Sequence, residues 1–206
     1  MFPLESVRLP GEDLPLRIFE PRYGALVRDC LAGEATFGVV LISAGREVGG
    51  QDVRHNVGTL ARIVAGEEYG EGRYRIECEM TDRIRVDAWH DDDPYPRATI
   101  SVWPDEPGAN VTGADIGDVE DRVMDLFERI ASAQEAQLPP RATLLGEPEP
   151  GEDAGARLFA LASRIPINQA DRYAVLAAPS AADRLDALRD AVETVAALVE
   201  FRLAAE

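Results

Sequence analysis

Hydrophobic and polar residues alternate in short stretches through the first hundred residues of the chain. Leu14, Leu16 and Ile18 are separated by Pro15 and Arg17, the period of two that is typical of a half-buried strand. Similar runs of apolar and β-branched residues predict further strands over residues 2–9, 36–43, 57–64, 73–80, 83–89 and 98–103. The pattern therefore predicts a β-rich lobe.

A proline interrupts the alternation after Phe19. Glu20 and Pro21 follow, and proline has no N–H to donate within a sheet but suits the first position of a helix. Behind it, apolar residues recur three and four positions apart and define one face of a helix that ends near Gly33: Tyr23, Leu26, Val27, Cys30 and Leu31. Residues 15–23, with the sequence PLRIFEPRY, therefore predict a strand-to-helix corner.

The hydrophobic period changes beyond residues 104–113, which are rich in Pro, Gly, Asn and Asp and indicate a boundary between two lobes. Asn168 is expected to cap one helix, and Ser180 with Asp183 is expected to cap the last. Apolar residues at spacings of three and four predict helices over residues 115–137, 156–164 and 169–177, and from Ser180 through about Leu203.

Three connections are predicted from composition. Residues 45–56 form a loop whose glycines, Gly45, Gly49 and Gly50, are interpreted as turn residues, because they do not form a GxGxxG fingerprint. Thr81 and Asp82 predict a turn between two strands. Residues 138–155, rich in Pro, Gly and Glu, predict a long loop that is a candidate for disorder.

Three stretches of the first lobe form a recognisable set in their order and spacing: LPLRIFEPRY at 14–23, FGVVLI at 37–42 and VGTLARI at 57–63. Together they resemble the N-terminal domain of the Lon proteases, the Lon substrate-binding family. In the second lobe, RIPI at 164–167 and ADRL at 182–185 resemble the tail of the same domain, less specifically.

The resemblance implies an α+β fold. We expect an N-terminal β-rich PUA-like pseudobarrel with one embedded helix at residues 1–104, followed by a C-terminal helical bundle at residues 115–206. Periodicity alone predicts only a β-rich lobe and a helical lobe.

Charge and composition exclude several functions. The chain carries 38 acidic residues against 21 arginines, a formal net charge of -17, and it has no lysine. A Walker A loop and a Ser-Lys protease dyad both require lysine, so the chain resembles the first Lon domain as a stand-alone protein without the ATPase and protease modules. No serine lies in a GxSxG motif, and we predict a protein that is not an enzyme.

The acidic surface also argues against nucleic acid as a partner, because it repels phosphate backbones. Arg73 and Arg75, and again Arg83 and Arg85, alternate along predicted strands and predict at most a small basic face. Membrane association is not expected, since no apolar run reaches the roughly 18 residues of a membrane span. We expect a cytoplasmic location.

No cofactor or metal is predicted. Cys30 and Cys78 lie at apolar positions and are interpreted as buried thiols rather than a disulfide or a metal pair. His90 precedes three aspartates, residues 91–93, but consecutive residues rarely point at one ion, so this stretch is interpreted as a solvated turn.

The resemblance implies recognition of exposed, largely apolar stretches of unfolded or tagged proteins, here called clients, which could then be passed to a protease in trans. Our candidates for the client-binding surface are Leu16, Phe19, Pro21 and Tyr23. The charged residues of the corner, Arg17, Glu20 and Arg22, have a structural interpretation, in which Glu20 and an arginine pin the corner to the barrel. The alternative function is a small-ligand-binding or regulatory PUA-like domain with a closed pocket.

Overall fold

The computed structural model describes residues 1–47, 52–148 and 151–204. They separate into two compact units, Met1–Pro104 and Asp105–Glu206, and each unit is described by itself. The predicted turn residues Gly49 and Gly50 lie outside the described residues. That each lobe forms an independent domain stays a prediction.

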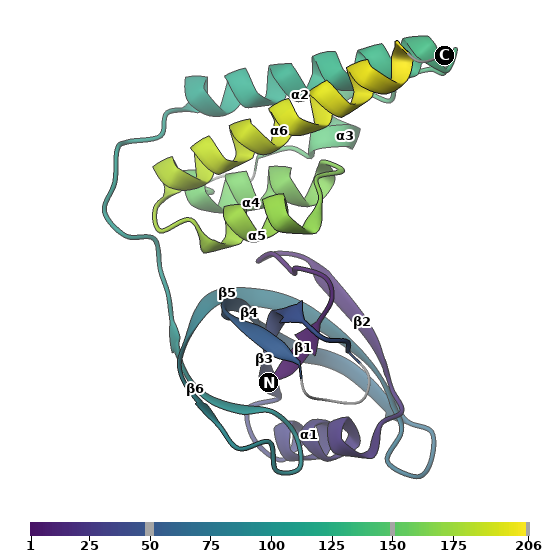
Figure 1. The fold of residues 1–206 in the computed structure, drawn as a ribbon, viewed down its shortest axis with the longest axis vertical. Helices are drawn as coiled ribbons and strands as arrows, with labels where there is room; N and C mark the ends of the chain where they lie inside the picture. Colours follow the sequence, from purple (N-terminus) through teal and green to yellow (C-terminus); the bar gives the residue numbers. More distant parts are fainter. Residues whose placement is uncertain (48–51, 149–150, 205–206) are drawn as a thin grey trace. The chain divides into compact units, whose positions relative to one another are not determined.

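The first unit is a mixed sheet with one helix, α1 (Figure 1). The strands follow the order β1-β3-β4-β5-β2, and β6 pairs with β5 outside this path. β1 runs parallel to β3, and the other pairs are antiparallel. The strand bounds are Phe2–Leu4 for β1, Asp13–Ile18 for β2, Thr36–Ala44 for β3, Val53–Glu68 for β4, Tyr74–His90 for β5 and Arg97–Val102 for β6.

Three expectations about this sheet are wrong. The strand predicted over residues 2–9 ends at Leu4. The predicted turn at Thr81 and Asp82 is part of β5, which continues through both residues. β5 pairs with β4 through a register shift between Thr59 and Ala61, and the Thr81 hydroxyl donates to the carbonyl oxygen of Leu60 at 3.2 Å, so a β-bulge takes the place of the turn. In addition, β4 begins at Val53, inside the predicted loop.

The helix α1 spans Pro21–Leu31, with Pro21 at its start as predicted. Its residue Gly24 lies against the turn between β4 and β5. A Cβ atom at Gly24 would overlap the carbonyl oxygen of Gly72, so the close approach of helix and turn requires glycine here.

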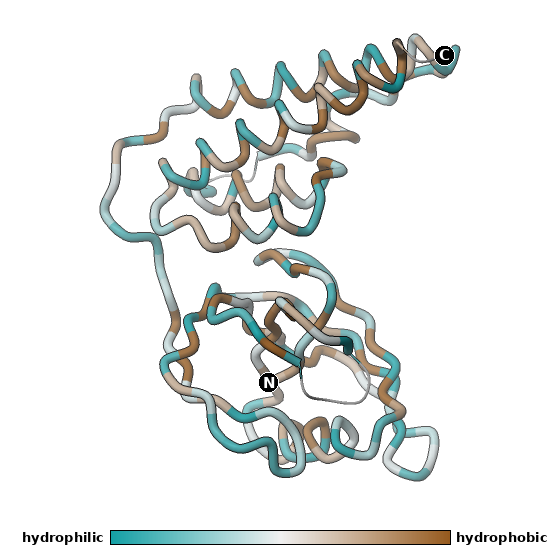
Figure 2. The backbone as a smooth tube through the Cα atoms, in the orientation of Figure 1, coloured by the Kyte–Doolittle hydropathy of each residue, from teal (hydrophilic) through white to brown (hydrophobic). Residues whose placement is uncertain are grey.

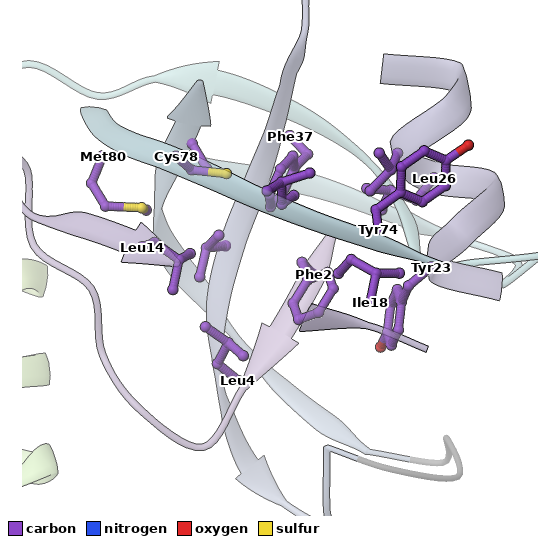
Figure 3. Close-up of a cluster of buried hydrophobic side chains, with 14 residues drawn as sticks. Phe2, Leu4, Leu14, Ile18, Tyr23, Leu26, Phe37, Tyr74, Cys78 and Met80 are labelled. Carbon is purple, nitrogen blue, oxygen red and sulfur yellow. The ribbon is translucent and has the colours of Figure 1, made fainter. Parts of the chain in front are cut away.

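A hydrophobic core lies between the sheet and α1 (Figure 3). Ile18 and Tyr74 come from β2 and β5, while Tyr23 and Leu26 come from one face of the helix. Phe2, from β1, lies against both Tyr23 and Phe37, with ring centroids 4.3 and 6.0 Å apart. The alternation in the sequence thus places every second residue of β2 and of the first half of β5 in this core.

The second unit contains the remaining helices of the described chain. They are α2 (Gly113–Ala133), α3 (Arg141–Leu145), α4 (Ala154–Arg164), α5 (Gln169–Ala177) and α6 (Ala181–Leu203). Hydrophobic and hydrophilic segments alternate along them (Figure 2), as expected for helices that bury one face. Asn168 caps α5 and Ser180 forms a capping box with Asp183 at α6, as predicted.

The long loop predicted over residues 138–155 is partly helical. It contains α3, and Leu145 at the end of this helix is 1% exposed and belongs to the core of the second unit. Arg157 of α4 donates to the carbonyl oxygens of Leu145 and Gly146 at 3.3 and 3.2 Å, which fixes the end of α3.

The helices α2 and α6 lie side by side and run in the same direction (Figure 1). Arg122 pairs with Glu193 at 3.2 Å, and Arg129 pairs with Glu200 at 2.6 Å, seven residues further along both helices. The α+β fold predicted from the sequence, a β-rich part with one embedded helix followed by a helical bundle, is confirmed.

Candidate functional site

The strand-to-helix corner exposes some of its apolar residues and buries others. Phe19 follows β2 and is 61% exposed, and Pro21 is exposed at the first position of α1. Leu16 is half-buried and packs against the core. These three candidates can contribute to a surface, and their role in client binding stays a prediction.

The fourth candidate, Tyr23, is part of the core in this structure. It is only 4% exposed, its ring packs on Phe2, and the Arg22 guanidinium lies 4.5 Å from its ring centroid. Burial raises the pKa of the Tyr23 hydroxyl to about 12. Figure 3 shows the ring among the core side chains, so it does not line an exposed surface.

The charged residues of the corner are only partly brought together. The Glu20 carboxylate accepts from the Arg22 side chain at 3.1 Å, and Arg22 also donates to the carbonyl oxygen of Glu47 at 3.2 Å. Arg22 therefore ties the start of α1 to the chain after β3. Arg17 lies apart from this pair, exposed on β2.

Arg17 instead lies on the outer face of the sheet, directly opposite Arg75 of β5. One step further along the strands, Arg73 lies over the ring of Tyr69 at 5.7 Å, and the Arg73 carbonyl accepts from the Tyr69 N–H at 3.1 Å. Phe19 follows Ile18, which pairs with Tyr74, so continued alternation places Phe19 on the Arg73 side. We call the five residues Arg17, Phe19, Tyr69, Arg73 and Arg75 the arginine–aromatic face.

Sequence reasoning identified this face incompletely. Arg73 and Arg75 could be found, because they alternate on a strand with one wet face. Tyr69 gave no signal, since it lies in a short turn-like stretch. Which residue of β2 lies opposite Arg75 depends on the register between β2 and β5. Residue spacing in the sequence does not encode that register.

The other basic pair, Arg83 and Arg85, has a different environment. Arg83 is 5% exposed and donates to the carbonyl oxygens of Trp103 and Pro104 at 3.0 and 3.2 Å. The guanidinium carbons of Arg83 and Arg85 lie 4.1 and 3.9 Å from the centroid of the Trp103 ring. Arg83 thus fixes the end of the first unit rather than forming an open basic surface.

The thiols and the histidine lack the features of a reactive or metal-binding site. Burial raises the pKa of the Cys78 thiol to about 12, and burial also raises that of Cys30, so neither is a ready thiolate at neutral pH. His90 contacts the Thr99 hydroxyl at 2.8 Å, and Asp92 pairs with Arg54. Among the described residues, no group of three potential ligands could hold a metal ion.

A depression of about 380 Å³ lies in the helical unit. Its lining includes Ile116, Gly117, Glu120 and Arg157. Glu120 accepts two bonds from Arg157, at 3.1 and 2.5 Å, so these two polar groups are directed at each other rather than at a ligand. The small-ligand alternative therefore gains little from this depression.

The architecture defines the class of protein. A half-barrel sheet, with a helix inserted after its second strand, is followed by a helical bundle. Within the described residues, no helix is both long and apolar enough to cross a membrane. The chain belongs to the ATP-dependent protease La (LON) substrate-binding domain family, whose model matches residues 1–194. The resemblance found in the sequence is thereby confirmed.

Solved structures of similar fold cover nearly the whole chain. The Lon N-terminal domain protein from Xanthomonas campestris has a TM-score of 0.65 at 25% identity, and the match covers 92% of this chain and 95% of that one. The N-terminal domain of the Mycobacterium avium complex Lon protease has a TM-score of 0.58 at 15% identity, with 92% and 94% covered, and this second likeness concerns the fold alone.

Curated relatives match over about half of this chain. The Lon protease of Anaeromyxobacter dehalogenans is 32% identical over 99 residues, and Lon protease 2 of Myxococcus xanthus is 31% identical over 103 residues. These stretches are 47% and 49% of this chain but only 12% of each relative, so this chain spans a small part of their length.

Proposed function

We propose that this chain is a non-enzymatic substrate-recognition module that binds exposed apolar segments of client proteins. The observation that carries the proposal is the pair of aromatic side chains on the arginine–aromatic face. Phe19 and Tyr69 directly follow β2 and β4, and they are 61% and 49% exposed. Aromatic side chains are the residues that most often anchor binding partners.

Family membership supports this assignment, because the family is described as a substrate-binding domain. The absence of lysine from the sequence supports a role without catalysis, since the chain cannot supply a Ser-Lys dyad or a Walker A lysine. In this proposal the bound client is cleaved by a protease acting in trans.

The test measures binding of fluorescein-labelled α-lactalbumin, unfolded by reduction and alkylation, by fluorescence anisotropy without ATP. We expect the wild type to bind and Phe19→Ala to bind about tenfold more weakly, because truncating an aromatic anchor costs on the order of 1–2 kcal/mol. The client should stay uncleaved on a gel.

Phe201→Ala provides a matched control, since Phe201 is 74% exposed on α6 in the other unit. This variant should bind the client like the wild type, and both variants should keep the wild-type melting temperature. Absence of binding by the wild type, or equal binding by Phe19→Ala and the wild type, would contradict the proposal. Cleavage that copurifies with the chain would contradict its non-enzymatic part.

A further inference from the structure

We propose that the arginine–aromatic face selects client segments in which an acidic side chain lies between apolar residues, with Arg17 and Arg75 binding the carboxylate. This inference rests on the proposed function and specifies the class of client. Its starting point is the register of β2 and β5, which places the two arginines directly opposite each other on the outer face of the sheet.

The pairing of two like charges is unfavourable in the free protein. Side chains directly opposite on antiparallel strands have Cβ atoms about 5 Å apart, and like charges at this distance destabilise the sheet. An anion between the two guanidinium groups would remove the repulsion. Arginine suits this task, because its planar group of donors matches the two oxygens of a carboxylate.

The carboxylates of the described sheet do not supply this anion. Nearby arginines are paired: Arg62 with Glu79 at 2.6 Å, and Arg73 with Glu71 at 3.3 Å. Arg17 and Arg75 form no such ion pair with any described residue, although the chain has 38 acidic residues. Arg75 also has a neighbour on β4, the strand on the other side of β5, where Glu67 lies directly opposite it. Glu67 forms no ion pair with Arg75 in the described structure.

The surroundings of the two arginines specify the rest of the segment. They line an open depression of about 490 Å³ together with Pro15, Leu16 and Glu77. Phe19 and Tyr69 lie one step along the strands, so a carboxylate at the arginines would place neighbouring apolar side chains against aromatic rings. Glu77 disfavours a run of acidic residues, and the net charge of -17 repels highly acidic chains in general.

The side-chain face is a better docking surface than the edge of the sheet. β2 is the last strand in the order, and Pro15 lies within it without an N–H to offer. A proline in an edge strand interrupts the ladder that an added strand requires. The occupant is therefore held through side chains, a carboxylate and its apolar neighbours.

The test uses three acetylated and amidated peptides that differ only in a central Glu, Gln or Lys between Leu and Phe residues. The blocked ends remove the terminal carboxylate, so only the central side chain carries the negative charge. By isothermal titration calorimetry at low salt, we expect the Glu peptide to bind wild type about fivefold more tightly than the Gln peptide, as two solvent-exposed ion pairs allow. The Lys peptide should bind most weakly, and high salt should reduce the preference.

Arg17→Gln and Arg75→Gln should each reduce the preference for Glu over Gln and keep the affinity for the Gln peptide. Arg97→Gln removes an exposed arginine from β6 in the same unit and should leave the preference unchanged. Arg17→Gln should melt at or above the wild-type temperature, because it relieves the repulsion with Arg75. Arg75→Gln should melt near the wild-type temperature, because it relieves the same repulsion but also removes the attraction to Glu67.

The outcomes separate this inference from the proposed function. Equal affinity for the Glu and Gln peptides, or an equal effect of all three variants, would overturn the inference while binding of unfolded α-lactalbumin still supported the proposed function. Binding of α-lactalbumin without binding of any peptide would have the same meaning. Failure to bind either probe would overturn both.

Discussion

The buried ion pair of the helical unit allows a sharp test of where stability comes from. Arg184 of α6 has a side chain only 1% exposed, and it donates two bonds to the Asp105 carboxylate at 2.9 and 2.5 Å. Its guanidinium carbon lies 3.7 Å from the centroid of the Phe159 ring, while its Nε has no hydrogen-bond partner in the described structure. Asp105 differs, because its side chain is 32% exposed.

This asymmetry predicts unequal costs for the two halves of the pair. Asp105→Asn leaves a guanidinium buried without its carboxylate, and uncompensated buried charges cost about 3 kcal/mol or more. Arg184→Met keeps an unbranched stem against Phe159 and leaves a carboxylate that water can reach. Because the remaining Asp105 carboxylate is 32% exposed and is not left as a buried charge, we expect Arg184→Met to change the free energy of unfolding by no more than about 1 kcal/mol.

Urea unfolding at pH 7, followed by the helical circular dichroism signal, measures both variants and the double variant. With a slope of about 1.5 kcal/mol per molar urea, Asp105→Asn should lower the midpoint by about 2 M. The double variant should resemble Arg184→Met, since the buried charge is then absent. If Arg184→Met destabilises as much as Asp105→Asn, the ion pair itself stabilises the unit and the reasoning fails.

Three further predictions concern glycine, pH and the two units. Gly117→Ala should raise the free energy of unfolding by about 1 kcal/mol, because a Cβ atom there meets nothing within 4 Å and alanine favours helix. Gly24→Ala should lower the thermal midpoint, because its Cβ atom would clash with the carbonyl oxygen of Gly72 in the turn. Burial alone would raise the pKa of Glu120, but bonds from two arginines hold it below its usual range. This carboxylate therefore stabilises the fold above its unfolded pKa of about 4.5, and urea midpoints should fall below that pH, less steeply in Glu120→Gln. A fragment of residues 1–104 should fold alone and give dispersed amide resonances, and an unfolded fragment would contradict the predicted domain division.

Local signals in the sequence were sufficient to predict where three of the described helices begin. Pro21 starts α1, Asn168 caps α5 and Ser180 caps α6, and each acts through a bond or a steric limit within a few residues. The β-bulge in β5 was not predictable in this way. Thr81 and Asp82 are suitable turn residues, and only pairing with β4, some twenty residues earlier, keeps them in a continuous strand.

The loop over residues 138–155 shows a related limit. Its composition is that of a disordered segment, but Leu145 is buried by long-range packing, and Arg157 holds the carbonyl at the end of α3. For Tyr23 the sequence contained the relevant signal, since it lies on the same helix face as Leu26. A residue on the apolar face of a helix is more often core than surface.

In the corner, strand alternation separates the core residues from the residues of the proposed binding surface. Ile18 is 2% exposed and Tyr23 is 4% exposed, so these side chains stabilise the first unit. Arg17 of β2 and Phe19, which directly follows β2, are exposed and contribute little to that core. Substitutions on the outer side can therefore change binding without the loss of stability that substitutions on the inner side cause. This separation is what allows the proposed surface to be tested by mutation, because a variant at Arg17 or Phe19 can lose a partner while the fold remains intact.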